Sequence, residues 1–109
     1  MIVATRQLTF VGPNGEHPLP IRIHAPQPDG PAWSCRYEID WPEGTEVRAA
    51  GGFDSVQALL VALQMVGTDL YTSNYHKAGQ LFFEKPGAGY GFPVPSTIRD
   101  LRVGNDKAL

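Results

Sequence analysis

The stretch WSCRYEIDW, residues 33–41, alternates apolar and polar side chains without interruption. Its odd-numbered positions are apolar or weakly polar and its even-numbered positions are polar or charged. Successive side chains of a β-strand point to opposite faces, so this pattern predicts a strand with one buried and one solvated face. The fold is therefore expected to contain an antiparallel sheet that is covered on one side only.

A second strand is expected to return alongside the first. Residues 42–44, Pro-Glu-Gly, supply turn chemistry, and TEVRAAG, residues 45–51, follows them. A loop centred on these three residues pairs position 41 with 45, 39 with 47 and 38 with 48. This register keeps apolar residues opposite one another, whereas a slip that opposes Ile39 to Arg48 is disfavoured.

An earlier hairpin is predicted from residues 7–11 and 19–25, which alternate in the same way around a Gly-Pro-Asn-Gly turn. The segment PQPDGP, residues 26–31, is expected to be a loop, because three prolines in six residues disfavour a hydrogen-bonded ladder. QLFFEK, residues 80–85, is predicted to be a short fifth strand.

One long helix is predicted to begin after Asp54. In D-S-V-Q the Asp54 carboxylate can accept from the Gln57 amide N–H while the Gln57 side chain reaches back, as in a capping box. At about 100° per residue, a wide apolar arc is expected to face the sheet; it comprises Val56, Leu59, Leu60, Leu63, Val66, Leu70 and Tyr71. A flank of Ala58, Ala62 and Met65 could admit another segment at close range, from the same chain or from a partner.

The predicted fold class is therefore α+β. Four to five antiparallel strands carry one helix packed across them, in the order β-β-β-β-α-β, followed by a Gly/Pro-rich C-terminal strap. A chain of 109 residues fits a single domain, 1–109. A short helix over about residues 97–103 is expected to end it.

The glycines of GAGYGFPVPSTIRDL, residues 87–101, allow two interpretations. A phosphate-binding loop requires G-x-x-x-x-G-K-[ST], but no lysine follows here and two prolines remove N–H donors. The one remaining feature that could favour an anion is Ser96, which could cap a helix whose N-terminus attracts a negative group. The favoured interpretation is a surface strap, residues 87–95, in which Tyr90 and Phe92 dock onto the helix or sheet.

Composition limits the classes of function. The net charge is −2 with only nine Lys+Arg, so electrostatic capture of nucleic acid is not expected. The single cysteine, Cys35, excludes an internal disulfide and suits a reducing compartment. No apolar run is long enough to cross a membrane, and the start of the chain lacks the pattern of a signal peptide. These features predict a cytoplasmic protein.

An acidic lip is predicted near the tip of the second hairpin. In the expected register Glu38 faces Arg48, while Asp40 faces Glu46 and Glu43 lies in the turn between them. Opposed like charges are mildly destabilising, so Asp40, Glu43 and Glu46 invite a functional explanation. The interpretations are an ordinary solvated turn, a contact for a basic partner, or a metal or acid–base site, and no histidine supports the last of these.

Catalytic motifs are absent from the sequence. The histidines at 17, 24 and 76 have no ligand spacing within one element, and Cys35 is expected to be a buried, inert thiol. No catalytic residue, cofactor or metal is therefore predicted. A recognition patch is expected instead at the helix end, built from Tyr71, Tyr75 and His76 together with Tyr90 and Phe92 of the strap.

The helix DSVQALLVALQMVGTDLY and the GYGFPVP segment together resemble a family of small bacterial proteins known only as a conserved domain of unknown function. The resemblance covers roughly residues 51–103. It implies a stand-alone bacterial cytoplasmic domain and carries over no catalytic residue.

The functional prediction is a non-enzymatic protein-binding module, and a specific version is an inhibitor of the immunity or antitoxin type. The acidic lip would then meet a basic enzyme. The alternative is a small-ligand or enzymatic cleft between helix end, sheet and strap, using Tyr75, His76, Tyr90 and Ser96. A third alternative is a homodimer through the flank of Ala58, Ala62 and Met65.

Overall fold

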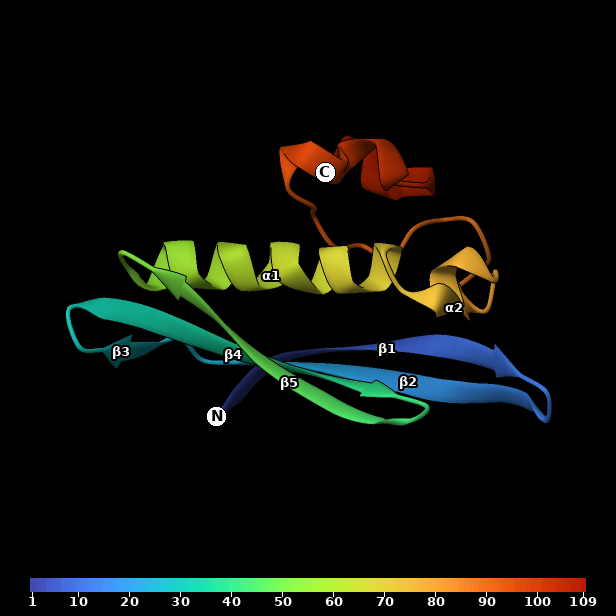
Figure 1. Ribbon diagram of the computed structural model, residues 1–109, viewed down its shortest axis with the longest axis horizontal. Helices are drawn as coiled ribbons and strands as arrows, with labels where there is room; N and C mark the ends of the chain where they lie inside the picture. Colours follow the sequence, from blue (N-terminus) through green and yellow to red (C-terminus); the bar gives the residue numbers. More distant parts are fainter.

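The computed structural model describes residues 1–109 as one antiparallel sheet, one long helix and a C-terminal tail that lies beyond the helix (Figure 1). The strands are β1 (Ile2–Gly12), β2 (Gly15–His24), β3 (Gln27–Asp29), β4 (Ala32–Trp41), β5 (Gly44–Gly52) and β6 (Leu81–Phe82). The helices are α1 (Ser55–Tyr71) and α2 (Asn74–Lys77), followed by 3₁₀ segments η1 (Ser96–Leu101) and η2 (Gly104–Ala108). None of these helices is both long and apolar enough to span a bilayer.

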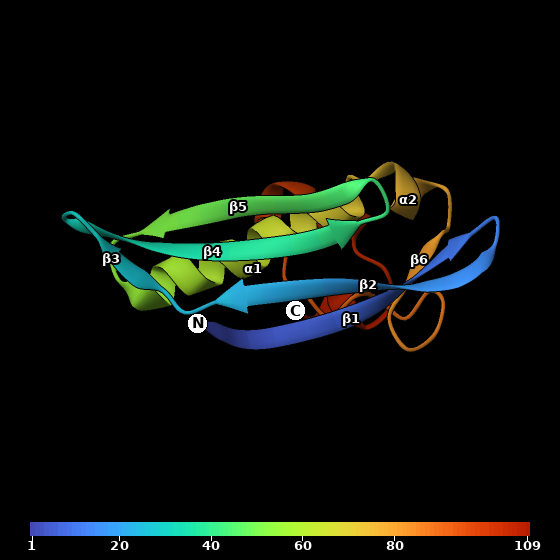
Figure 2. The same ribbon diagram turned by 90° about the horizontal axis from the view of Figure 1, so that it is seen from below.

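Strand β4 joins the two halves of the sheet. Along one edge it pairs with β5, and along the other it pairs with β2 and β3. Strand β2 pairs with β1, and β1 with β6, so the order is β5-β4-β2-β1-β6 with β3 beside the start of β4 (Figure 2). The predicted α+β fold, with a helix packed on an antiparallel sheet, is confirmed. The sheet has six strands where four to five were predicted.

The prediction of a loop at residues 26–31 is wrong, because part of it forms β3. Gln27, Pro28 and Asp29 pair with residues 34, 33 and 32 of β4. A proline is tolerated in an edge strand, where its missing N–H costs no ladder bond if that position faces solvent. Gly30, with a φ of 59°, provides the tight turn into β4.

The register predicted for the second hairpin is also wrong. Strand β5 pairs Gly44 with Trp41 and Glu46 with Ile39. Ile39 was expected to lie opposite Val47, so the strand is shifted by one residue. The shift is opposite in direction to the disfavoured slip that would place Arg48 opposite Ile39. The turn contains two residues, Pro42 and Glu43, in place of three. As a result Glu46 and Arg48 lie on the helix-facing side of the sheet, while Val47 faces solvent with 53% of its surface exposed.

The start of α1 confirms the capping prediction. The Asp54 side chain accepts a hydrogen bond of 2.8 Å from the Gln57 N–H. The Gln57 side-chain oxygen in turn accepts one of 2.6 Å from the Phe53 N–H. Two of the N–H groups at this helix end are thereby satisfied locally, and the helix boundary is fixed by residues 53–57.

The face that α1 turns to the sheet agrees with the predicted arc only in part, because Val66, Leu70 and Tyr71 of that arc are buried. Ala58 and Ala62 are fully buried with Val66 and Leu70, whereas Val56 is 71% exposed. The small alanines allow the helix to approach β4 and β5, which it contacts most. The alanine flank is thus occupied by the same chain. The prediction that Ala58 and Ala62 are available to a second copy is therefore wrong.

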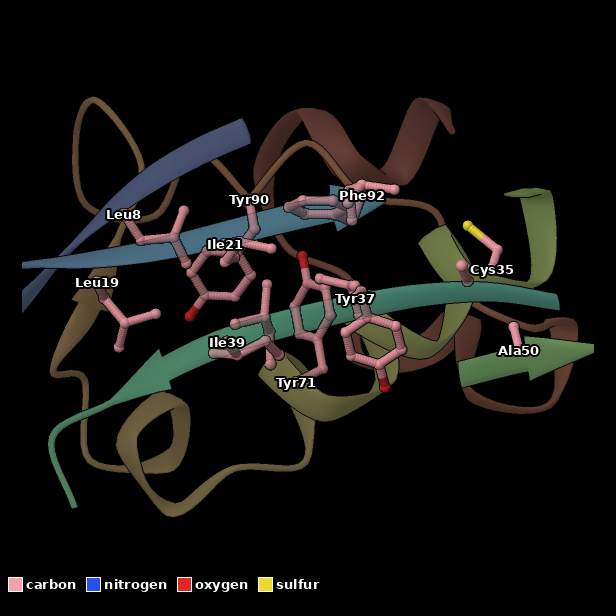
Figure 3. Packing of buried hydrophobic residues seen from close by; sticks show 14 of the residues in the cluster. Leu8, Leu19, Ile21, Cys35, Tyr37, Ile39, Ala50, Tyr71, Tyr90 and Phe92 are labelled. Carbon is pink, nitrogen blue, oxygen red and sulfur yellow. The ribbon is translucent and has the colours of Figure 1, made fainter. Parts of the chain in front are cut away.

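Because α1 covers the β4–β5 half of the sheet, the β1–β2 half needs another cover, and the C-terminal strap provides it. Tyr90 and Phe92 are 3% and 5% exposed and pack with Leu8 and Ile21 of the sheet (Figure 3). Arg6 of β1 donates to the carbonyl oxygens of residues 90 and 91, at 3.1 and 3.0 Å. The prediction of a docked strap is supported by this burial.

The tail after the strap is held by one buried carboxylate. Asp106, 1% exposed, accepts hydrogen bonds from the Tyr71 hydroxyl at 2.5 Å, the Tyr90 N–H at 2.8 Å and the Gly91 N–H at 2.7 Å. We call this arrangement the Asp106 latch. The helix predicted at 97–103 is instead the 3₁₀ segment η1, which has no side-chain cap, so Ser96 does not cap a helix. The fifth strand predicted at 80–85 is reduced to β6.

Candidate functional site

The structure separates the three residues of the predicted acidic lip. Asp40 lies on the open face of the sheet, where Arg22 donates to its two carboxylate oxygens at 2.9 and 2.6 Å. Thr45, its cross-strand neighbour, donates a further hydrogen bond of 2.8 Å. These bonds, led by that from Arg22, lower the pKa of Asp40. Its charge is therefore compensated within the chain.

Glu38 follows the same pattern, and its predicted pairing with Arg48 is wrong. Its carboxylate accepts a hydrogen bond of 2.7 Å from Arg22, and its cross-strand neighbour in β5 is Val47. The bond from Arg22 lowers the pKa of Glu38. Like charges are consequently not opposed in this hairpin, since Glu46 lies opposite Ile39.

Glu43 and Glu46 instead line a cavity at the tip of the β4–β5 hairpin. The cavity measures about 570 Å³ and lies between this tip, the end of α1 and α2. We call it the acidic pocket; its lining residues are Trp41, Glu43, Glu46, Asp69, Thr72, Ser73, Asn74, Tyr75, Ala78 and Gln80. Its volume is in the range of protein sites that hold one small ligand or one long side chain.

Two aromatic rings form one wall of the acidic pocket. The Tyr75 ring stacks on Trp41 with 5.5 Å between centroids and 19° between planes, and its other side meets the edge of Phe10. The Tyr75 hydroxyl donates to the Glu43 carboxylate, which raises the pKa of Tyr75. Tyr75 is therefore held between β1 and the hairpin tip, with its hydroxyl at the pocket.

Asp69 contributes a third carboxylate from the last turns of α1. It accepts hydrogen bonds from the Tyr37 hydroxyl at 2.5 Å and from Arg48 at 2.8 Å. Burial and the Asp69 carboxylate raise the pKa of Tyr37 well above its usual range. Burial and the nearby charge of Asp69 also raise the pKa of Glu46. The pocket therefore carries more negative charge than Arg48 alone compensates.

This arrangement favours a cation. Three carboxylates surround the pocket, and Arg48 binds only one of them, Asp69. The Trp41 side chain of the lining adds an aromatic surface of the kind that attracts guanidinium and ammonium groups. The carboxylates do not form a cluster able to hold a metal ion. The pocket can thus hold an organic cation or a basic side chain through charge and stacking.

Sequence reasoning identified Glu43, Glu46 and Tyr75 but missed Trp41, Asp69 and Arg48. Asp69 is the only acidic residue inside α1, and a charge within a helix predicted to lie on a sheet could have been recognised as a signal. Arg48 was missed because the predicted register directed it to the wrong face.

Three of the other predicted recognition residues, Tyr71, His76 and Tyr90, form a second cluster. The rings of Tyr71, His76 and Tyr90 pack together with centroid distances of 4.9 to 5.5 Å, and the Tyr90 hydroxyl contacts His76 Nδ1 at 2.5 Å. Burial and the charge of Asp106 raise the pKa of Tyr90 to about 12. Tyr71, Tyr90 and Phe92 are buried, so they belong to the core and not to a surface patch.

A smaller cavity of about 220 Å³ adjoins this cluster. His76 and Tyr90 line it, together with the glycines at the start of the strap. It is the nearest counterpart of the predicted cleft between helix end, sheet and strap. Of the four residues predicted for that cleft, Tyr75 lines the acidic pocket instead and Ser96 lines neither cavity.

The position of His76 predicts a dependence of stability on pH. Burial lowers the pKa of His76, so the folded state favours the neutral ring. The contribution of the neutral His76 ring to the free energy of unfolding is fully present above the unfolded pKa of about 6.5, and it is lost as the pH falls through that value. We expect the free energy of unfolding to decrease from about pH 7 to about pH 5.5, and the His76→Gln variant to show a shallower slope in urea titrations. Equal slopes in the two proteins would contradict this assignment.

Comparison with known proteins adds a family but no activity. The family model described as a domain of unknown function (DUF6968) matches residues 4–94. No match was found among curated proteins or among solved structures. The matched range includes nearly all of the sheet, α1 and most of the strap; it contains the three donors of the Asp106 latch but ends before Asp106 itself. The resemblance to a domain of unknown function is therefore confirmed. The match extends further toward the N-terminus than the two motifs indicated. The chain belongs to the DUF6968 family.

Proposed function

We propose that this protein is a non-enzymatic docking module whose acidic pocket receives a basic side chain of a partner protein. The observation that carries the proposal is the conjunction of Glu43, Glu46 and Asp69 with the stacked rings of Trp41 and Tyr75 around one cavity. An arginine fits this arrangement best, because its planar guanidinium can stack on an aromatic face and donate to carboxylates in the same plane.

The electrostatics of the pocket support an arginine or lysine guest. Glu46 has a raised pKa because of burial and the neighbouring Asp69 charge, so an incoming cation would relieve repulsion between the two. The Glu43 carboxylate lies at the exposed mouth, where a charge attracts a partner before contact. The pocket is thus suited to rapid, salt-sensitive association with a positively charged surface.

A more specific version is an inhibitor of the immunity or antitoxin type, expressed in the bacterial cytoplasm. An enzyme that binds a polyanionic substrate presents a positively charged surface, and a small module with an acidic pocket would suit such a surface. The neighbouring genes test this version directly. The expected result is a toxin-sized reading frame beside this one, whose product is neutralised when the two proteins are co-expressed. A product that remains equally toxic would exclude the inhibitor role.

The Glu43→Lys variant tests the docking proposal. Affinity purification from the native host should retain a basic partner on the wild-type protein, and that partner should associate with the variant at least about tenfold more slowly. The difference should shrink as salt is raised, because screening removes long-range attraction. The matched control is Asp29→Lys, an exposed carboxylate in β3 beside the start of β4 and away from the pocket, which should bind as wild type. Unchanged association of Glu43→Lys would remove the acidic pocket from the interface.

The second candidate is a small-ligand function in the cavity beside His76 and Tyr90. It is favoured by one observation: the cavity is lined by a half-buried imidazole whose pKa is lowered by burial. A thermal shift with one class of metabolite, abolished by His76→Gln and unaffected by Glu43→Lys, would assign function to this cavity. An unchanged shift in His76→Gln would place the ligand elsewhere.

A further inference from the structure

Strand β5 forms an open edge of the sheet along its whole length. It pairs only with β4, and no hydrogen bond within the chain is made to the outward-facing backbone groups of residues 44–52 (Figure 2). The nine consecutive pairs with β4 contain no bulge, and β5 contains neither proline nor lysine. Natural proteins usually protect a long edge with such features or with inward-pointing charges, because unpaired N–H and C=O groups readily accept another strand, and of these β5 has only the charges of Glu46 and Arg48.

The side chains of β5 indicate which strand could be added. Val47 lies near the middle on the open face and is 53% exposed. On the helix side, Glu46 and Arg48 flank it with opposite charges. Side chains alternate between the two faces of a strand. If a second copy of β5 adds antiparallel with its helix on the same face of the sheet, even-numbered residues must therefore lie opposite even-numbered ones, and odd opposite odd.

We propose that a second copy of this chain adds to this edge, with the two β5 strands antiparallel about a two-fold axis at Val47. In this register Val47 lies opposite Val47 of the other copy. Glu46 of each copy lies opposite Arg48 of the other, which places two cross-strand ion pairs on the helix side. The remaining pairs are Thr45 with Ala49 and Gly44 with Ala50. The two sheets would continue as one.

Neighbouring registers lack this complementarity. Centring the axis on Glu46 opposes the two Glu46 carboxylates, and centring it on Arg48 opposes the two Arg48 guanidinium groups. Like charges directly opposite one another destabilise a strand pair. An axis at Ala49 leaves both charges opposite small apolar residues and gives no ion pair. The charges on β5 therefore favour one self-pairing, and they also disfavour unspecific ones.

The two charged side chains on the helix side of β5, Glu46 and Arg48, are available for these ion pairs. Arg48 is 46% exposed and uses one guanidinium nitrogen to bind Asp69, which leaves further donors for a carboxylate of the other copy. Glu46 has no basic partner within the chain; its one hydrogen bond is a long one of 3.5 Å from Trp41. A second Arg48 would supply that partner.

The helices are also compatible with the dimer. Because α1 lies over β4 and β5, both copies of α1 would lie on the same face, one on each side of the junction (Figure 1). Val61 and Met65 precede Asp69 by two helical turns and one, so they share the β5 side of α1 with it, and both are half-buried. They are positioned to face the other helix across the two-fold axis.

This inference goes beyond the proposed docking function and does not depend on it. Val47 points away from the acidic pocket, so variants at Val47 test the edge without altering the pocket lining. Glu46 lines that pocket and also enters the proposed ion pair, so the Glu43→Lys binding test is carried out in the Val47→Lys protein as well as in the wild type.

Two opposite substitutions at the axis test the proposal. Wild-type protein should form dimers in sedimentation or light scattering at two concentrations. Val47→Lys and Val47→Glu each oppose two like charges at the axis, so we expect each to weaken the dimer by roughly tenfold or more. Because Val47 is exposed, Val47→Lys should keep the wild-type melting temperature within a few degrees, whereas Val47→Glu, which lies opposite Glu38 of β4, should melt lower but still fold.

Mixing the two variants provides the decisive result. An equimolar mixture places lysine opposite glutamate at the axis, so heterodimers should form where neither variant dimerises alone. Ala49→Lys, exposed on the same face of the same strand, lies opposite Thr45 in this register and should dimerise more strongly than Val47→Lys. A wild-type monomer at all concentrations, a Val47→Lys dimer as stable as wild type, or no recovery on mixing would each overturn the proposal. Pairing of the edge with a foreign protein strand by a monomeric wild type would assign β5 to another partner and overturn it equally.

Discussion

Replacing Asp106 with alanine is expected to lower the free energy of unfolding by about 3 kcal/mol. The Asp106 carboxylate accepts three hydrogen bonds and is 1% exposed. Its removal leaves the buried Tyr90 N–H and Tyr71 hydroxyl without this acceptor, which costs more than the bonds themselves are worth in water. Urea denaturation measures the effect, and amide exchange at Tyr90 and Gly91 should accelerate along with it.

A double-mutant cycle separates the latch from general packing. Tyr71→Phe removes only the hydroxyl that donates to Asp106 and accepts from the Val103 N–H. We expect Tyr71→Phe and Asp106→Ala together to destabilise by at least about 1 kcal/mol less than the sum of the single effects. The control is Asp100→Ala, an exposed carboxylate in the same tail, which should change stability by less than about 0.5 kcal/mol. Strict additivity, or an equal effect of Asp100→Ala, would show that the carboxylate does not hold the tail.

The parts of the fold that could be predicted from sequence are those fixed by local chemistry. The helix start depends on residues 53–57 alone, and its capping box was correctly identified. The face of β4 was predictable because Cys35, Tyr37 and Ile39 are fully buried and alternate with polar residues. In both cases the information lies within a few residues of chain.

The register of the second hairpin could not be predicted because β5 is not patterned by burial. Of its nine residues only Ala50 is buried, and Val47, which was expected to face the core, is exposed. The inward side carries Glu46 and Arg48, which are stabilised there by Trp41 and Asp69 from elsewhere in the chain. An apolar-to-apolar rule therefore misaligned the strands, and the acidic pocket was missed with them.

Long-range contacts explain the remaining differences. The helix face was assigned only in part: Val66, Leu70 and Tyr71 are buried as predicted, but the strap supplies Tyr90 and Phe92 to the other half of the core, and Val56 stays exposed. The latch joins Tyr71 to Asp106 across 35 residues of sequence, and nothing near Asp106 marks it as buried. One helix thus lies against the sheet on one side and against the strap on another.

The point where α1 meets the strap predicts the second large effect. Gly67 is buried, and a Cβ atom at this position would lie 2.2 Å from the carbonyl oxygen of Pro93 and 3.0 Å from a methyl group of Val94. In an exposed helix interior, Gly→Ala stabilises by about 1 kcal/mol. Here the contact is with backbone, so Gly67→Ala must displace the strap and is expected to destabilise by about 2 to 3 kcal/mol.

The sign of the change distinguishes close packing from helix propensity. Gly51→Ala is the matched control, because its Cβ would meet no atom closer than 3.9 Å and its backbone needs no positive φ. We expect Gly51→Ala to alter the free energy of unfolding by less than about 1 kcal/mol, whereas Gly67→Ala should unfold at clearly lower urea concentration and expose Phe92 to solvent. A Gly67→Ala protein more stable than wild type would mean that the strap does not rest on this helix. The β1–β2 half of the core would then need a different cover, because Leu8, Leu19 and Ile21 cannot remain fully buried without one.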